Sequence, residues 1–260
     1  MEPQHYYALF MFLALVVFVV ARQLQPKSPE LSRMPGWQHA ALALAAFVGG
    51  VLGAKASFAL AETSNWLSID DWRHAWFRDG KTITTGLIGA YLAVELTKLV
   101  LGIRVKTGDS FALPMALAMV VGRWGCFFNG CCYGTPTTLP WGVTFRMPDG
   151  ELLRCHPTQI YESLFHLTMA GILIVLIRYD LLRYQRLKFY LIAYCVYRFL
   201  TEFIRPEPIW WQGLTFYQWA ALALMFGLAV QWVWDQRGIA RERQARTGRS
   251  SPVELATHLD

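Results

Sequence analysis

The chain alternates long apolar runs with short polar segments, a pattern that predicts a bundle of membrane-spanning helices. Most runs approach or reach about 17–25 residues, the length with which an α-helix crosses a hydrocarbon core of about 30 Å. Seven spans are expected, at approximately Tyr6–Ala21, Ala40–Leu60, Thr84–Ile103, Phe111–Gly130, Gln159–Ile177, Leu187–Ile204 and Leu214–Trp234. We therefore expect an all-α polytopic membrane protein with one transmembrane domain at residues 1–235 and a loosely ordered basic tail at residues 236–260.

Basic residues are distributed unequally between the two sides of these spans. If the N-terminus faces out, the inside segments carry Arg22, Lys27, Arg33, Arg104, Lys106, Arg178, Arg183, Arg186, Lys188, Arg237, Arg241, Arg243, Arg246 and Arg249. The outside segments carry Arg73, Arg78, Lys81, Arg146, Arg154 and Arg205. Because short cytoplasmic loops are enriched in Lys and Arg, the N-terminus is expected outside and the C-terminus in the cytoplasm.

Composition supports the membrane interpretation. The 260 residues are 55% hydrophobic and only 16% charged, which is too apolar for an ordinary soluble domain. The formal net charge of +6 does not indicate a nucleic-acid groove, because the basic residues lie in loops and in the tail. No small-residue cleavage site follows the first apolar run, so that run is expected to be a retained helix.

The second expected span is rich in small residues. Gly49 and Gly53 are four residues apart, and such a pair lets two helix backbones approach closely in a membrane. We interpret this pair as a helix-packing feature.

Four groups of ionisable residues fall in or beside the expected spans. They are Lys55 with Glu62, Glu95 with Lys98, Glu162 with His166, and Arg198 with Glu202 and Arg205. An ionisable group at membrane depth is costly and normally faces the bundle interior or a wet cavity. Glu95 and Lys98 are interpreted as a structural pair, whereas Lys55 either extends toward the membrane surface or faces a cavity.

Five charged or polar residues fall at similar depth near the outer leaflet: Arg123, His156, Glu162, Glu202 and Arg205. Two arginines at that depth indicate an anionic ligand, since the planar guanidinium group suits phosphate oxygens. A phospholipid headgroup supplies such a phosphate. The alternative is a structural ion-pair network, for example between Arg123 and Glu202.

Three of the five cysteines, Cys126, Cys131 and Cys132, form a local cluster. Their spacing is not that of a zinc site with paired C-x2-C ligands, although His156 is a conceivable fourth ligand. A disulfide, a reactive thiol activated by Arg123, and simple packing of small buried residues remain open. Cys195 is expected to be a buried small hydrophobe. No metal or cofactor is assigned.

Two segments carry a family resemblance: GRWGCFFNGCCYG at 122–134 and HPTQIYES at 156–163. They resemble the G-R-x-G-N-F-x-N-G-E-x-x-G and H-P-[ST]-Q-x-Y-E signatures of the prolipoprotein diacylglyceryl transferase family. Further similar segments follow in order: HYYALFMF (5–12), GVLGAKASF (50–58), TTGLIGAYLAV (84–94), EFIRPEP (202–208) and GLTFYQW (213–219).

The resemblance implies an enzyme of lipoprotein biosynthesis in the bacterial cytoplasmic (inner) membrane, with seven helices, the N-terminus outside and a site near the outer leaflet. Such an enzyme moves the diacylglyceryl unit of phosphatidylglycerol to the lipobox cysteine of a preprolipoprotein, without a cofactor. The matched catalytic positions are Arg123, His156, Glu162, Glu202 and Arg205. The matched substrate-binding positions are Tyr7, Lys55, Asn129, Gly134, Gln159 and Tyr161.

Several positions depart from the family pattern, among them Lys55, which stands where the family has an arginine. Thr84 and Thr85 stand where the family has a histidine and a glycine, and Cys126 and Cys131 stand for an asparagine and a glutamate. A threonine cannot act as a general base at neutral pH.

Another residue is therefore expected to act as the base, and the candidates are His156, Glu162 and His74. The phosphate-binding half of the site is expected to be retained and the acceptor-activating half rebuilt.

Three functions are compatible with these features. The first is diacylglyceryl transfer from phosphatidylglycerol, by default to a lipoprotein cysteine. The second is transfer of a glycerophosphoryl or other headgroup fragment to a different acceptor. The third is a non-catalytic lipid-binding or thiol-redox membrane protein. A monomer is expected, because the charges can all be buried internally.

Overall fold

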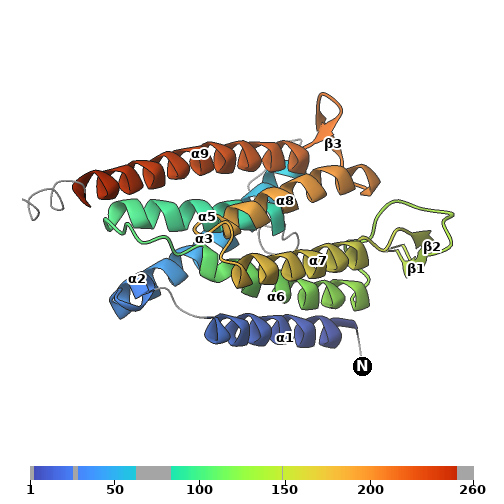
Figure 1. The fold of residues 1–260 in the computed structure, drawn as a ribbon. Coiled ribbons are helices and arrows are strands. Elements are labelled where there is room, and N and C mark those ends of the chain that lie inside the picture. The colour runs from blue at the N-terminus through green and yellow to red at the C-terminus, as the bar shows by residue number, and fades with distance from the viewer. Residues whose placement is uncertain (1–2, 26–28, 63–82, 148, 251–260) are drawn as a thin grey trace, which may run out of the picture.

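A computed structural model describes residues 3–25, 29–62, 83–147 and 149–250 of the chain (Figure 1). Side chains are described at 5–25, 31–55, 83–147 and 149–237. His74 and the carboxylate of Glu62 fall outside these ranges. The predictions made for these two side chains therefore stay predictions.

The described chain is mainly helical. The helices are α1 (Pro3–Leu24), α2 (Pro29–Ser32), α3 (Gly36–Glu62), α5 (Ile83–Val100), α6 (Asp109–Phe128), α7 (Thr158–Arg178), α8 (Arg186–Thr201), the 3-10 helix η1 (Glu202–Ile204) and α9 (Phe216–Ser250). Two antiparallel hairpins pair β1 (Val143–Arg146) with β2 (Leu152–Cys155) and β3 (Ile209–Trp211) with β4 (Leu214–Thr215).

Six of the described helices are long and apolar enough to cross a membrane: α1, α3, α5, α6, α7 and the first part of α9. α8 corresponds to the expected sixth span but has only 16 residues. The outward faces of the helices are apolar, as Phe12, Phe47, Leu99 and Phe226 illustrate with 60–80% exposure. A bundle with exposed large apolar side chains and a polar interior is the arrangement that a lipid solvent favours. The chain is a multi-pass membrane protein.

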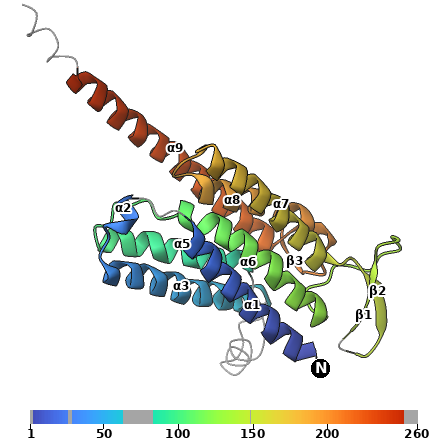
Figure 2. The same ribbon diagram turned by 60° about the horizontal axis from the view of Figure 1, so that its bottom comes forward.

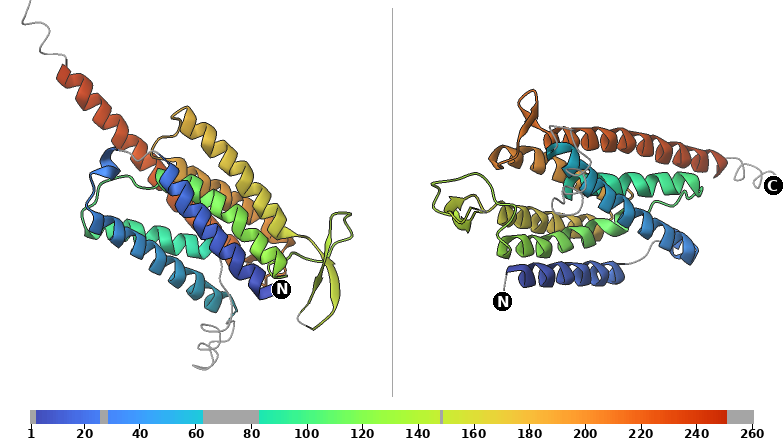
Figure 3. Two further views of the ribbon diagram at one scale, coloured as in Figure 1. Left: turned by 90° about the horizontal axis from the view of Figure 1, so that it is seen from below. Right: turned by 180° about the vertical axis from the view of Figure 1, so that it is seen from behind.

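The helices pack in sequence-adjacent and distant pairs. α3 lies against α5 on one side of the bundle, and α1 lies along α6 at its surface (Figure 2). α6 also packs against α7, and α8 against α9 (Figure 3). The element order alone predicts the pairs α6–α7 and α8–α9, but not the pair α1–α6.

The predicted close packing at Gly49 and Gly53 is confirmed. A Cβ atom on Gly49 would overlap the carbonyl oxygen of Gly89, and one on Gly53 would overlap that of Thr85. Both partners lie on α5, so the small residues bring two backbones into direct contact.

An apolar core lies between α6, α7, α8 and α9. Its fully buried members include Ala112, Leu173, Tyr190 and Leu228. Cys195 belongs to this core at 1% exposure, which confirms its prediction as a buried small residue.

Two boundary predictions are wrong. Leu214 and Thr215 form strand β4 instead of opening the last helix, because they pair with β3 across a tight turn at Gln212 and Gly213. The segment after Trp234 was expected to be loosely ordered. It is helical instead, because α9 continues to Ser250. Neither hairpin was predicted from the sequence.

The two ends of the bundle differ in the elements that meet there. The site end is where α1, α7 and α9 begin and α6 and α8 end, beside both hairpins (Figure 1). The far end is where α1 ends, α2 lies and α9 projects away.

Candidate functional site

The thiol cluster is built by the loop that follows α6. The helix ends at Phe128, and Gly130 then adopts a positive φ of 68°. Cys132 also has a positive φ, 65°, which is uncommon for a residue with a side chain and is strained. The backbone thus turns sharply at both residues, and the loop folds back onto the end of α6.

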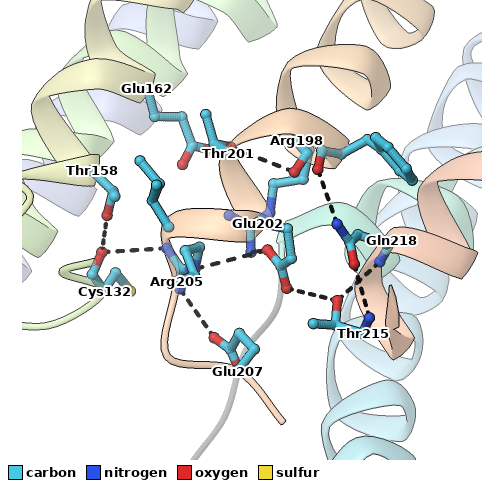
Figure 4. A network of polar contacts seen from close by, with 12 residues as sticks. Cys132, Thr158, Glu162, Arg198, Thr201, Glu202, Arg205, Glu207, Thr215 and Gln218 are labelled. Carbon is cyan, nitrogen blue, oxygen red and sulfur yellow. Dashed lines mark hydrogen bonds and ion pairs between the residues drawn. The ribbon is translucent and has the colours of Figure 1, made fainter. Parts of the chain in front are cut away.

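Side chains from two distant segments fix this loop. Gln159 donates from Nε2 to the carbonyl oxygen of Cys131 at 2.6 Å. Thr158 donates from Oγ1 to the carbonyl oxygen of Cys132 at 2.5 Å, and Arg205 donates to the same oxygen at 3.3 Å (Figure 4). The backbone N–H of Cys131 donates to the carbonyl oxygen of Cys126 at 3.1 Å. The loop is therefore held by α7 and by the segment after η1.

The three sulfur atoms of Cys126, Cys131 and Cys132 lie within 4.8 Å of one another. None of the five cysteines, all of which are described, forms a disulfide. Hydrogen bonding with the thiols of Cys126 and Cys131, together with the charges of Arg123 and Arg205, holds the pKa of the Cys132 thiol well below its usual range. Both guanidinium groups therefore act on the same sulfur atom.

Arg123 is buried near the end of α6 and pairs with Glu162 of α7. The same carboxylate oxygen, Oε1, accepts a hydrogen bond from Tyr194 at 2.7 Å. His166 Nε2 lies 3.8 Å from it, as the i,i+4 spacing on one helix face allows. The ion pair Arg123–Glu202, which the sequence analysis gave as an example, is not formed. The carboxylate beside Arg123 is that of Glu162, because α6 packs against α7.

Glu202 is the second buried carboxylate, with 2% exposure. Its Oε2 lies 2.9 Å from Arg198 and 4.0 Å from Arg205, and its Oε1 accepts a hydrogen bond from Thr215 at 3.1 Å. Arg205 also pairs with Glu207 at 3.3 Å (Figure 4). Glu202 thus fixes both arginines from one position.

The two arginines that flank the thiol cluster retain an unused donor. Within the described part of the chain, Nε of Arg123 and Nε of Arg205 are buried and make no hydrogen bond, although Nε of Arg205 lies 4.0 Å from Oε2 of Glu202. A buried N–H without a partner costs about 1–3 kcal/mol. Two such donors on cationic groups that converge on one loop favour an anion as the missing partner.

His156 lies between β2 and α7 and is half-buried. Its Nδ1 is 3.3 Å from the hydroxyl of Tyr161, which in turn accepts a hydrogen bond from Trp141 Nε1 at 2.8 Å. The backbone of His156 pairs with Gly134, two residues beyond Cys132. The backbone of His156 therefore lies beside the thiol loop, and its imidazole contacts Tyr161 and makes no ion pair with a carboxylate among the described residues.

The remaining predicted site residues divide into two groups. Tyr7 interacts electrostatically with all three cluster cysteines, and Asn129 caps α6, so both lie at the cluster. A Cβ atom on Gly134 would lie 2.6 Å from the carbonyl oxygen of Ile204, so the glycine is needed for loop packing. Lys55 is half-buried on α3, and its assignment as a substrate-binding residue stays a prediction.

The departures from the family pattern at Thr84 and Thr85 lie at the start of α5, where both side chains are buried. Thr85 also contacts Gly53 through its carbonyl oxygen. These residues therefore contribute to the packing of α5 against α3.

Sequence reasoning missed four polar residues that complete the network: Thr158, Tyr194, Thr215 and Gln218. Thr158, Thr215 and Gln218 lie inside segments already quoted for the resemblance, so their position was an available signal. Tyr194 offered none, because a tyrosine in an apolar helix is ordinary.

Comparisons with known proteins agree with these motifs. A family model described as prolipoprotein diacylglyceryl transferase matches residues 3–234. A protein of Gloeobacter violaceus named phosphatidylglycerol–prolipoprotein diacylglyceryl transferase is 32% identical over 205 residues, which cover 75% of this chain and 76% of that protein. A protein of the same name from Fervidobacterium nodosum is 31% identical over 207 residues, covering 75% and 68%. A third, from Clostridium tetani, is 33% identical over 173 residues, covering 64% and 68%.

Proposed function

The chain belongs to the prolipoprotein diacylglyceryl transferase family, and from this premise we propose that it transfers a diacylglyceryl unit from phosphatidylglycerol to a cysteine thiol of a preprolipoprotein. One observation supports this most: Arg123 and Arg205, 82 positions apart in sequence, both act on the Cys132 thiol and both keep a buried Nε donor without a hydrogen bond among the described residues. A phosphodiester supplies the anionic oxygens that these donors need.

In the proposed reaction the acceptor thiolate attacks the glyceryl carbon that carries the phosphate. A carbon–sulfur bond forms, the carbon–oxygen bond to phosphate breaks, and glycerol 1-phosphate leaves. Negative charge grows on the departing phosphate, where the guanidinium groups of Arg123 and Arg205 stabilise it. Glu162 and Glu202 orient these arginines through the ion pairs of the site.

His156 is the proposed acceptor of the thiol proton. Among the candidates named from the sequence, Glu162 is paired with Arg123 and bonded to Tyr194, so its lone pairs are largely used. His156 faces Tyr161 instead of a charge and lies beside the thiol loop. An imidazole is the side chain best suited to proton transfer near neutral pH.

We further propose seven membrane spans, with α8 and η1 together forming the short sixth one, in the cytoplasmic membrane. The excess of basic residues in the segments that join the far ends of the helices supports a cytoplasmic far end and an external N-terminus. The site end then lies at the outer leaflet, where lipid headgroups and the acceptor are available. A monomer is proposed because the described charges of the site are paired within one chain.

The test uses the full chain in vesicles with phosphatidylglycerol labelled separately in an acyl chain and in the headgroup, together with a lipobox peptide that contains one cysteine. Acyl label on the peptide, with release of labelled glycerol phosphate, is the expected result. Headgroup label on any acceptor indicates transfer of a headgroup fragment instead. No turnover of either label overturns the proposal. A peptide with serine in place of cysteine is the matched control.

A further inference from the structure

We propose that the thiols of Cys126, Cys131 and Cys132 bind one Zn²⁺ ion and leave its fourth coordination position open for the acceptor thiol. The binding of the metal stands on the cluster alone. The binding of the acceptor thiol at the open position rests on the proposed function, which is transfer to a thiol.

The distances in the cluster suit this ion. The three sulfur atoms lie within 4.8 Å of one another. With Zn–S bonds of about 2.3 Å, tetrahedral ligands lie about 3.8 Å apart, so no pair of sulfurs needs to approach by more than about 1 Å. The backbone carbonyls of Cys131 and Cys132 are held by Gln159 and Thr158, so we assign this approach to rotation of the cysteine side chains.

The backbone explains how two adjacent cysteines can serve one ion. In an extended chain the side chains of neighbouring residues point to opposite faces. Two adjacent cysteines such as Cys131 and Cys132 could then not bind the same metal ion. Cys132 instead has a φ of 65°, and the loop turns back toward the end of α6. This strained conformation brings both thiols to the side of Cys126.

The number of protein ligands in the cluster is that of a catalytic metal site. Structural zinc sites have four protein ligands, whereas catalytic sites have three and an open position. In the described part of the chain, the ligand group contains these three cysteines and no fourth histidine, cysteine or carboxylate.

The surrounding charges favour the complex. Three thiolates and one Zn²⁺ ion carry a net charge of −1. Arg205 donates to the carbonyl oxygen of Cys132 at 3.3 Å, so its guanidinium group places a positive charge beside this anionic complex. The cluster is buried at Cys126 and half-buried at the other two residues, so a peptide thiol can reach it from one side.

The chemistry at the open position balances without another reactant. The acceptor thiol binds the metal as a thiolate, and its proton passes to His156 and then to solvent. The bound sulfur attacks the glyceryl carbon of the lipid, and the carbon–oxygen bond to phosphate breaks. The product thioether is a weak ligand and leaves the metal, which stays Zn²⁺ throughout.

Metal binding is tested with Co²⁺, which replaces Zn²⁺ and absorbs visibly when tetrahedral. The full chain in detergent, purified under reducing conditions, is expected to bind about one Co²⁺ per chain, with thiolate-to-cobalt charge-transfer absorption. Cys126→Ser, Cys131→Ser and Cys132→Ser each lose that absorption. Cys155→Ala and Cys195→Ala, which change buried thiols outside the cluster, keep it.

Absence of charge-transfer absorption in the wild-type chain overturns the proposal, and so does absorption that survives all three cluster substitutions. Zinc content of the freshly purified chain, measured by mass spectrometry, is the second readout. It is expected to fall at least tenfold in the three serine variants and to remain in the two alanine controls.

The open position is tested by adding the lipobox peptide to the Co²⁺-loaded chain. A thiolate that enters as fourth ligand increases the charge-transfer absorption, and the serine peptide does not. An unchanged spectrum overturns the assignment of the acceptor to the metal and makes the site structural. None of these measurements needs turnover, so a failure of the proposed transfer leaves the metal result readable, and the reverse also holds.

Discussion

The two ends of the bundle both bury charge, but they satisfy it differently. At the far end, Arg186 donates from Nε to the carbonyl oxygen of Leu181 at 2.9 Å and from a terminal nitrogen to Asp180 at 2.8 Å. At the site end, Arg123 and Arg205 have paired terminal nitrogens, yet their Nε groups make no hydrogen bond among the described residues. The Nε donor of the arginine is thus hydrogen-bonded at the far end and makes no hydrogen bond at the site end.

The lysines of the far end extend this contrast. Lys98 pairs with Glu95 at 3.0 Å, which confirms the predicted structural pair, and Lys106 and Lys188 share Asp235. These groups border a cavity of about 730 Å³ with a mainly apolar lining. Complete pairing is typical of groups that stabilise a fold, whereas unmade bonds on a rigid frame are typical of a binding site.

The largest expected effect comes from breaking the Arg123–Glu162 pair. Arg123→Ala leaves a buried carboxylate without its cation, which costs about 3–5 kcal/mol of folding stability, and it also removes a phosphate donor. Thermal unfolding in detergent and the rate of glycerol phosphate release measure the two losses. The double variant Arg123→Met/Glu162→Gln is expected to recover most of the stability but none of the activity. Recovery of activity would show that the arginine serves the fold alone.

Arg205→Ala is expected to lower the transfer rate by about 10²–10³-fold, the effect of removing one preorganised donor from a developing anion. Arg205→Lys is expected to do little better, because an ammonium group cannot reproduce the planar fork. Glu207→Gln is the matched control, since it removes a partner of Arg205 and leaves the guanidinium in place. Wild-type turnover in Arg205→Ala would show that Arg205, like Arg186 at the far end, does not take part in the transfer.

Gly89→Val tests whether the site depends on the α3–α5 contact. A Cβ atom on Gly89 would overlap the carbonyl oxygen of Gly49, so the helices must separate. Overpacking of this kind costs about 1–3 kcal/mol and is expected to lower the unfolding temperature. Gly171→Val, at a helical glycine with open space around it, is the control. An equal change in both variants contradicts the packing role.

The smallest effect is expected at the far end. Lys106→Ala removes a partly exposed ion pair, worth about 1 kcal/mol or less, and leaves Asp235 paired with Lys188. Transfer activity is expected to remain within twofold of the wild type in the labelled-lipid assay. A loss comparable to that of Arg205→Ala would show that the far end takes part in catalysis.

Much of the helical framework was predictable because it depends on local sequence. Each expected span overlaps a helix, and all but the last agree in both bounds within a few residues, since the length and hydropathy of a run decide whether it fits a bilayer. The last span is the exception, because α9 continues to Ser250. The hairpins were missed because their strands have only two to four residues, too few for an alternation such as V-T-F-R in β1 to stand out as a strand signal. The site residues on α6, α7 and η1 were identified from motifs, but the motifs do not state which charges pair.

The sequence by itself determined the apolar spans, the small residues of α3 and the identity of the charged groups. The tertiary structure decided the partners. Arg123 pairs with Glu162, 39 positions away, because α6 packs against α7. Glu202 pairs instead with Arg198 and Arg205. The direction of the Cys132 side chain was likewise set by a backbone turn that Gln159, Thr158 and Arg205 hold from outside the loop. Pairing energies of buried charges depend on distance in space, which the order of residues along a chain does not contain.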